Sequence, residues 1–372
     1  MQNVAKLHFC LKRERKADSQ PFNDASMHSD LLFDATMPTP KSCFFKPFVV
    51  QVAIAMLLLM APPVAAETRA ILIGVGRFDY LNITPLEGPV NDVVLMAATL
   101  RMRGIPEKNI VQLTDYAAIN FLPRRANILR ALKHAASASR VGDRVIVYLS
   151  GHGAQVPQPK GVPANGWIEP DGLDEVFLTR DTRMWDKKNQ RVEGALLDDE
   201  IGDALAAFTR KGVHVWAIFD TCHAGDMVRG GPSDEAHTIW RGVPPESLGV
   251  ATVRWPLNTR VRMARSPTPP KRSGSLTTFY ATQPDEASPE EMLPLIALAR
   301  GDAPNRATGS EGIPLDNAKR VRYGVFTWHV ANALNDGASS YVDLVQKINL
   351  GYDRRPFPTP LFDGALNVAL PF

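Results

Sequence analysis

Cysteine is scarce in this chain of 372 residues, which has only Cys10, Cys43 and Cys222. Only Cys222 lies beyond residue 66, so a mature protein without the first 66 residues could form no intramolecular disulfide. This excludes a fold held together by disulfides. The lone thiol in the stretch IFDTCHAGD, residues 218–226, therefore needs another explanation.

An excess of charge of one sign is also lacking. Lys and Arg number 42 against 39 Asp and Glu, and the formal net charge is only +3. Nothing in this balance suggests a general surface for nucleic acid, so we expect no nucleic-acid partner. With 45% hydrophobic and 22% charged residues, the composition is typical of one large globular domain or two small ones.

The uncharged apolar run at 48–60 has 13 residues, about two-thirds of the roughly 20 that span a bilayer as a helix. Lys41 and Lys46 precede it and the small residues Val64-Ala65-Ala66 follow, which is the layout of an export signal cleaved after Ala66. We expect a periplasmic or secreted protein without a stable membrane span, or an anchored one if the signal is not cleaved. The polar stretch 1–36 is long for a signal, which favours Met37 as the start.

From residue 67 onward, short apolar runs alternate with amphipathic segments. The pattern predicts strands at 69–75, 109–114, 143–150 and 213–219, and helices at 90–104, 123–138 and 197–208. Pro123 would open the second helix. Strands that alternate with helices predict an α/β fold in which a mostly parallel sheet is covered by helices on both faces.

The pattern is interrupted at 226–275, where Gly, Pro and Arg are frequent, and we expect a mobile basic linker there. Regular structure resumes with a strand at 275–282. An irregular acidic loop to about residue 322, helices at 323–335 and 340–350 and a closing strand near 365–369 complete the prediction.

His152 and Cys222 each follow a predicted strand, at the sheet edge where α/β enzymes gather their catalytic groups. Glycines flank His152 in YLSGHG, and Ala224-Gly225 leave room beside Cys222 in FDTCHAG. A thiol nucleophile needs a nearby imidazole and donors for an oxyanion, and both segments supply such groups. A buried structural cysteine is the alternative for Cys222.

Five motifs in order resemble the caspase-like cysteine peptidases, most closely the metacaspases and their bacterial relatives. They are YLSGHG, EPDGLDEVF at 169–177, LLDDE at 196–200, FDTCHAG and YATQPDEAS at 280–288. The resemblance covers about 67–372 and implies a caspase-like α/β/α sandwich. It divides this domain into a large-subunit-like part, 67–225, the linker 226–275 and a small-subunit-like part, 276–372.

The resemblance also implies roles for individual residues. Cys222 attacks the scissile carbonyl, His152 delivers the proton to the leaving amine, and the amides of Gly153 and Cys222 form the oxyanion hole. Asp92 and Asp220 line the pocket for a basic side chain, so that protein or peptide substrates are cut after Arg or Lys. For Asp92, a carboxylate that stabilises a helix N-terminus is the alternative.

Several metacaspases use calcium, and their aspartate pair matches Asp198 and Asp199. Adjacent carboxylates suit a hard cation, but they also suit a helix start. A further ligand of the family falls on Arg229, which a cation would not accept as a ligand. We therefore expect that no cofactor is required.

Two readings rival a peptidase with basic specificity. One is a caspase-like domain without activity that serves as a binding or scaffold module. The other is a legumain-like or clostripain-like peptidase of different specificity. The arginine-rich linker adds the expectation that the chain cuts itself between about residues 229 and 272, because exposed flexible segments are good substrates.

Overall fold

The computed structural model describes residues 66–158, 172–222, 238–251, 274–283, 286–296, 319–353, 355 and 358–372. The chain divides into two compact units, Met1–Pro63 and Val64–Phe372, and all the described residues belong to the second. The apolar run at 48–60 and the alternative start Met37 lie outside them. None of the helices in the described ranges is long and apolar enough to cross a membrane.

A six-stranded sheet forms the centre of the second unit, in the order β14-β11-β9-β3-β1-β2. Its strands are β1 (Thr68–Val75), β2 (Ile110–Leu113), β3 (Arg144–Gly151), β9 (His214–Asp220), β11 (Leu276–Tyr280) and β14 (Leu361–Gly364). All neighbours run parallel except β11 and β14, which are antiparallel. This is the mostly parallel sheet that the alternation of strands and helices predicted.

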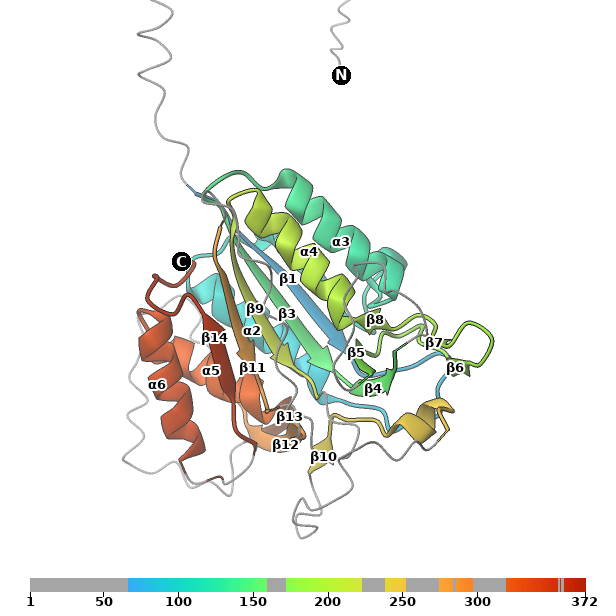
Figure 1. The fold of residues 1–372 in the computed structure, drawn as a ribbon. Helices are drawn as coiled ribbons and strands as arrows, with labels where there is room; N and C mark the ends of the chain where they lie inside the picture. Colours follow the sequence, from blue (N-terminus) through green and yellow to red (C-terminus); the bar gives the residue numbers. More distant parts are fainter. Residues whose placement is uncertain are drawn as a thin grey trace, which may run out of the picture. The chain divides into compact units, whose positions relative to one another are not determined.

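The central strands are apolar throughout because both of their faces are covered. Along β3, Ile146 and Tyr148 belong to one buried cluster, whereas Val145, Val147 and Leu149 belong to the other. Helices α2 (Gly88–Met102), α5 (Val325–Asn335) and α6 (Tyr341–Tyr352) pack on the first face, and α3 (Arg125–Ala138) and α4 (Asp198–Arg210) on the second. Figure 1 shows these two helical layers on either side of the sheet. The predicted three-layer α/β architecture is confirmed.

Three smaller sheets lie beside the central one. The first joins β10 (Ile239–Trp240), β12 (Pro289–Pro294) and β13 (Arg320–Gly324), and the second joins β4 (Gly153–Pro157), β5 (Leu173–Phe177) and β8 (Leu196–Leu197). The third is the hairpin of β6 (Trp185–Asp186) and β7 (Arg191–Val192). Short 3-10 helices at Glu107–Asn109, Ile119–Phe121 and Pro245–Leu248 complete the elements of the described residues.

Several sequence expectations are wrong in detail. The helix expected from residue 123 begins at Arg125, and the closing strand lies at 361–364 and not at 365–369. The loop expected to be irregular as far as residue 322 contains β12 and β13. β12 escaped prediction because a proline stands at each end and two glutamates interrupt its apolar pattern.

The expected mobile linker also contains regular structure. Residues 238–251 form β10 and a 3-10 helix, and β10 pairs with β12. The remainder of that linker, at 226–237 and 252–273, lies outside the described residues. The boundaries of the predicted subunit-like parts stay a prediction.

Candidate active site

The register of the central sheet brings His152 and Cys222 to the same edge. Ser150 on β3 pairs with Asp220 on β9, and each predicted catalytic residue lies two positions beyond its member of this pair. Because parallel strands end at the same edge, both residues emerge there side by side. Both are buried, with 2% of His152 and 0% of Cys222 exposed.

The imidazole of His152 is oriented by a hydrogen bond with Thr84, and the backbone of Arg241 also acts on the ring. Its Nε2 lies 2.8 Å from the carbonyl oxygen of Thr84, which can only accept, so Nε2 carries the proton. Its Nδ1 is buried and has no hydrogen-bond partner among the described residues. Burial lowers the pKa of His152 to about 4, so the ring is neutral at pH 7 and Nδ1 holds a free electron pair. This is the state that a general base requires.

Gly153 lies directly against the backbone of Cys222. A Cβ atom built on Gly153 would fall 1.7 Å from the carbonyl oxygen of Cys222, so only glycine allows this approach. The thiol Sγ lies 2.8 Å from the carbonyl oxygen of Glu286, to which it donates. The segments that carry the histidine and the cysteine are thus in van der Waals contact at this edge.

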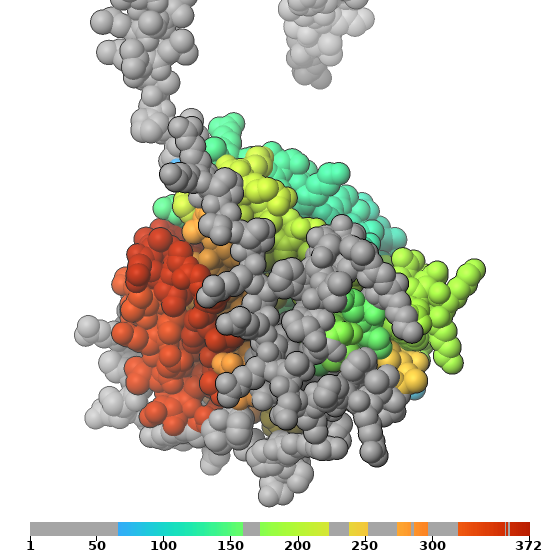
Figure 2. Space-filling view, viewed as in Figure 1, coloured from blue at the N-terminus to red at the C-terminus, as the bar shows by residue number. Residues whose placement is uncertain are grey.

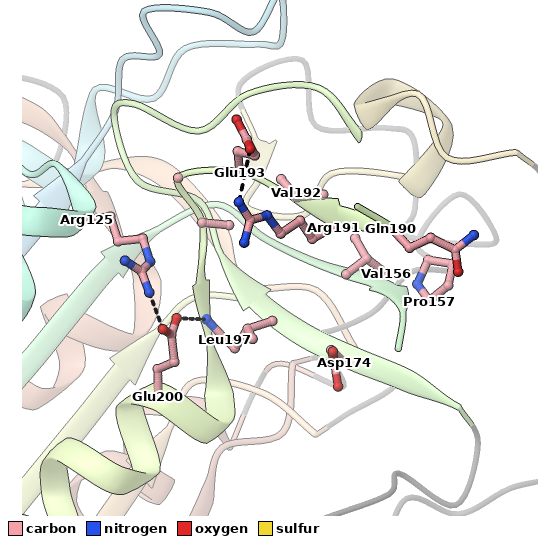
Figure 3. A pocket seen from close by; sticks show the side chains of 12 residues that line it. Arg125, Val156, Pro157, Asp174, Gln190, Arg191, Val192, Glu193, Leu197 and Glu200 are labelled. Atoms are coloured by element: carbon pink, nitrogen blue, oxygen red, sulfur yellow. Dashed lines mark hydrogen bonds and ion pairs between the residues drawn. The ribbon is translucent and has the colours of Figure 1, made fainter. Parts of the chain in front are cut away.

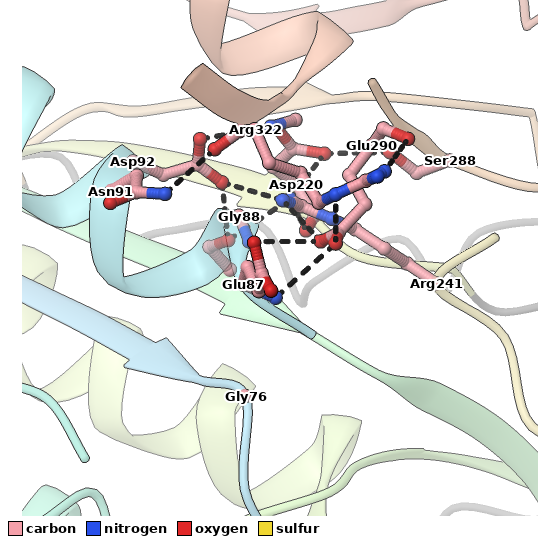
Figure 4. A network of polar contacts seen from close by, with 12 residues as sticks. Gly76, Glu87, Gly88, Asn91, Asp92, Asp220, Arg241, Ser288, Glu290 and Arg322 are labelled. Carbon is pink, nitrogen blue, oxygen red and sulfur yellow. Dashed lines mark hydrogen bonds and ion pairs between the residues drawn. The ribbon is translucent and has the colours of Figure 1, made fainter. Parts of the chain in front are cut away.

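Asp92 and Asp220, the predicted pocket residues, are brought together in one fully buried network (Figure 4). Asp92 lies on α2 and accepts hydrogen bonds from Ser150 Oγ at 2.8 Å and from the amide of Gly324 at 2.9 Å. Asp220 accepts from Ser288 Oγ at 2.6 Å and from the amide of Thr327 at 3.0 Å. The two carboxylates are therefore held in place by donors from several elements.

The guanidinium of Arg241 lies between these carboxylates and is 0% exposed. Its Nη2 is 2.6 Å from Asp92 Oδ2, and its Nη1 is 3.1 Å from Asp220 Oδ1 and 2.9 Å from Ser150 Oγ. Sequence reasoning missed Arg241, because it stands within the segment assigned to the linker. The only signal was a basic residue directly after the apolar pair Ile239-Trp240.

A third carboxylate, Glu290 on β12, was also missed. Its Oε2 lies 3.4 Å from Arg241 Nη2, and its carboxylate accepts from the amides of Glu87 and Gly88 at 3.3 and 3.2 Å. Cβ atoms on Gly88 and on Gly324 would come within 2.5 Å of the guanidinium nitrogens, so two glycines make the walls of the pocket. The pocket thus fits a flat, planar cation.

The charges in this pocket do not balance, because Arg241 faces three carboxylates and the only other cation in contact with them among the described residues is Arg322, whose Nε lies 3.9 Å from Glu290 Oε1. Burial raises the pKa of Asp92 to about 7 and Asp220 adds to the effect, although Arg241 opposes it. Burial likewise raises the pKa of Glu290. Burial by itself would lower the pKa of Arg241, but Asp220, Asp92 and Glu290 raise it above its usual value. The arginine is therefore permanently charged, and the pocket strongly favours a cation.

Two hollows on the described surface lie away from these residues. One, of about 280 Å³, is bordered by the ion pairs Arg125–Glu200 and Arg191–Glu193 (Figure 3). The other, of about 580 Å³, lies between α3 and α4, whose surfaces adjoin in Figure 2. Neither contains a predicted site residue.

Asp198 and Asp199 begin α4, as the helix-start alternative requires. The next residue, Glu200, is engaged with the amide of Leu197 and with Arg125. Across the residues that the structure describes, no three His, Cys, Asp or Glu side chains are grouped to hold a metal ion. Arg229 lies outside them. Whether Asp198 and Asp199 bind calcium stays a prediction.

Comparison with known proteins shows which family this chain resembles. Residues 68–229 match the family model described as metacaspase, peptidase C14 domain. Metacaspase-1B of Aspergillus fumigatus is 34% identical over 159 residues, which are 42% of this chain and 35% of that protein. Metacaspase-1 of Candida albicans is 31% identical over 165 residues, which are 44% of this chain and 34% of that protein. The matched part spans about a third of the length of these curated relatives.

A solved structure agrees with the fold. Protein GSU0716 from Geobacter sulfurreducens superimposes with a TM-score of 0.50 over 80% of this chain and 93% of that one, at 23% identity. At that identity the likeness concerns the fold alone. The sequence matches show that residues 68–229 are similar to the metacaspase peptidase C14 domain, and the architecture agrees with that likeness.

Proposed function

We propose that this chain is a cysteine endopeptidase that hydrolyses proteins or peptides after arginine or lysine. One observation carries the specificity: a guanidinium is bound in a fully buried pocket made by Asp92, Asp220 and Glu290. Carboxylates bind such a group through charge-assisted hydrogen bonds and would repel an acidic side chain. The pocket lies at the sheet edge that carries His152 and Cys222, because Ser150 and Asp220 contact Arg241 two positions before these residues.

In the proposed reaction, His152 Nδ1 takes the thiol proton of Cys222, and Sγ attacks the carbonyl carbon of the scissile bond. The carbonyl oxygen becomes an oxyanion that the amides of Gly153 and Cys222 stabilise. When the intermediate collapses, the C–N bond breaks and the leaving amine takes the proton from His152. Water then hydrolyses the thioester, which releases the new carboxylate and restores the thiol.

The geometry of His152 favours this proposal over a scaffold without activity. Leaving a polar atom buried without a partner is costly, and Nδ1 of His152 is such an atom. A scaffold domain gains nothing from that cost, whereas a general base needs an unoccupied electron pair. The three carboxylates likewise favour basic specificity over a legumain-like preference for a neutral or acidic residue.

The proposal extends to the parts of the protein that lie outside the described residues. It includes export by the signal at 48–66, which N-terminal sequencing of the mature protein tests by a start at Glu67. It also includes turnover without a required metal, as well as self-cleavage in the linker segment. Equal turnover with added calcium and with a chelator is the expected result, and a strict need for calcium would overturn that part.

The decisive experiment offers the purified full chain matched fluorogenic peptides that end in Arg, Lys, Asp or Asn. Cys222→Ala serves as the control, because it removes the nucleophile and leaves the pocket intact. We expect turnover of the Arg and Lys peptides by the wild type alone. No turnover of any peptide by correctly folded protein would favour the scaffold, and turnover of the Asn or Asp peptide would favour a different specificity.

A further inference from the structure

Residues 239–241 are bound to the rest of the domain in the way an extended peptide binds. β10 runs antiparallel to β12, with Ile239 opposite Glu290 and Trp240 opposite Pro289. The amide of Arg241 continues this pattern by donating to the carbonyl oxygen of Ser288 at 2.8 Å. A strand added at the edge of a sheet is a general mode of peptide recognition.

The backbone after Arg241 then passes along Gly153. The amide of Gly153 donates to the carbonyl oxygen of Arg241 at 3.1 Å. In the other direction, the amide of Val243 donates to the carbonyl oxygen of Gly153 at 3.0 Å, and Gly242 is bridged to Gly153. The Arg241 carbonyl oxygen thus accepts a hydrogen bond from the Gly153 amide, which is one of the two donors that stabilise the oxyanion in the proposed reaction.

Both the side chain and the backbone of Arg241 therefore contact residues of the proposed active site. The guanidinium fills the pocket of three carboxylates, the amide pairs with Ser288, and the carbonyl oxygen contacts Gly153. A residue that was merely buried for stability would need only the first of these contacts. All three are needed by the residue on the acyl side of a scissile bond.

We infer that Arg241–Gly242 is a processing site at which the chain cleaves itself in cis; this rests on the proposed peptidase activity. Cys222 Sγ forms a thioester with the Arg241 carbonyl carbon as the bond to Gly242 nitrogen breaks. The thiol proton passes through His152 Nδ1 to the new Gly242 amine. Water then hydrolyses the thioester, so that Arg241 ends in a carboxylate and Cys222 regains its thiol.

The inference also explains how the pocket becomes available to other substrates. While the chain is intact, the guanidinium of Arg241 occupies the position between Asp92, Asp220 and Glu290. Cleavage turns residues 239–241 into a chain end that can leave β12. An external peptide with a basic residue then takes the same place.

The test follows the full chain after purification, with intact-mass measurement and sequencing of all new termini. We expect wild-type protein to give one fragment that ends at Arg241 and one that begins at Gly242, and Cys222→Ala to stay intact. The rate should not change on dilution, since Arg241 already lies in its own pocket. Arg254→Ala, a substitution elsewhere in the linker segment, should retain the cut.

Arg241→Ala would leave three buried carboxylates without their cation, so Arg241→Lys is the more informative variant. Lysine keeps the charge but offers one nitrogen where arginine offers two, and we expect a cut about tenfold slower with an unchanged thermal transition. Cleavage only at another bond, or a rate proportional to protein concentration, would overturn the inference. An Arg peptide assayed in parallel separates the two failures: turnover without a cut at 241 overturns this inference alone, whereas absence of both also refutes the peptidase.

Discussion

Arg241 Nη2 lies 2.6 Å from Asp92 Oδ2, and neither side chain has any solvent exposure. The two residues are far apart in the sequence, on α2 and directly after β10. A pair this deeply buried is costly to break, because the remaining charge is left without a partner. The same pocket chemistry would apply to any arginine that replaced Arg241.

Asp92→Asn is expected to weaken recognition of basic substrates. Removing one partner of a buried charge pair costs roughly 2–5 kcal/mol, which corresponds to a loss of about 30-fold or more in kcat/KM for peptides ending in Arg. Steady-state kinetics after linker cleavage measures this. Asp203→Asn, which changes an exposed carboxylate on α4, is the matched control and should have no effect. Unchanged kcat/KM in a folded Asp92→Asn protein would show that Asp92 does not bind the basic side chain of the substrate.

Glu290→Gln is expected to reduce the preference, measured as kcat/KM, for peptides ending in arginine over peptides ending in lysine. Glu290 meets Nη2 of the guanidinium, and a lysine ammonium held by Asp220 has no second nitrogen to reach it. We expect about a tenfold drop in kcat/KM for Arg peptides, equivalent to about 1.4 kcal/mol, and a smaller drop for Lys peptides. The neighbour Glu291 faces Arg355 instead, so Glu291→Gln serves as the control. An equal drop for both peptides would contradict this role.

Gly153→Ala is expected to abolish turnover. The added Cβ would fall 1.7 Å from the Cys222 carbonyl oxygen, which forces the two segments apart and displaces the Gly153 amide from the oxyanion. Gly202→Ala is the matched control, because nothing lies within 4 Å of a Cβ there and the site is inside α4. That control should stabilise the protein by about 0.5–1 kcal/mol. Full activity in Gly153→Ala would show that catalysis does not need the close packing of Gly153 against the Cys222 backbone.

The buried imidazole of His152 predicts a loss of stability in acid. Its pKa is about 4 in the folded protein and near 6.5 when unfolded, so unfolding takes up a proton between these values. The contribution of His152 is therefore complete above about pH 6.5 and is lost as the pH falls towards 4, by about 3 kcal/mol.

Urea unfolding of Cys222→Ala with and without His152→Gln measures this contribution. The difference in unfolding free energy between the two proteins should shrink by that amount from pH 6.5 to 4. His329, whose pKa burial also lowers to about 4, is present in both proteins and cancels. A difference that does not depend on pH would mean that His152 is not buried as described.

The apolar strands and the two residues that follow them could be predicted from the sequence. Continuous runs such as VIVYL in β3 show burial on both faces, and strand ends in α/β folds mark the edge where His152 and Cys222 lie. The Asp92 and Asp220 positions followed from the family resemblance, and the structure brings them together around one cation.

The remainder of the pocket could not be predicted, because it depends on pairing between distant segments. Glu290 and Glu291 are adjacent in the sequence, yet strand alternation sends one to Arg241 and the other to Arg355. Arg241 looked like one of many basic residues in a segment rich in Gly and Pro. Only the pairing of β10 with β12 shows that it is buried.

The pairing of Ser150 with Asp220 has a consequence for protein engineering. Side chains alternate between the two faces of a strand, so deleting one residue within β9 would turn Asp220 towards α3 and α4 and take it out of the pocket. Insertions in the loops between β3 and β9 do not change which side chains of the two strands face the pocket. Variants of this protein should therefore tolerate changes of length in the loops that join β4, β5, β8 and α4, but not within β3 or β9 or at His152 and Gly153.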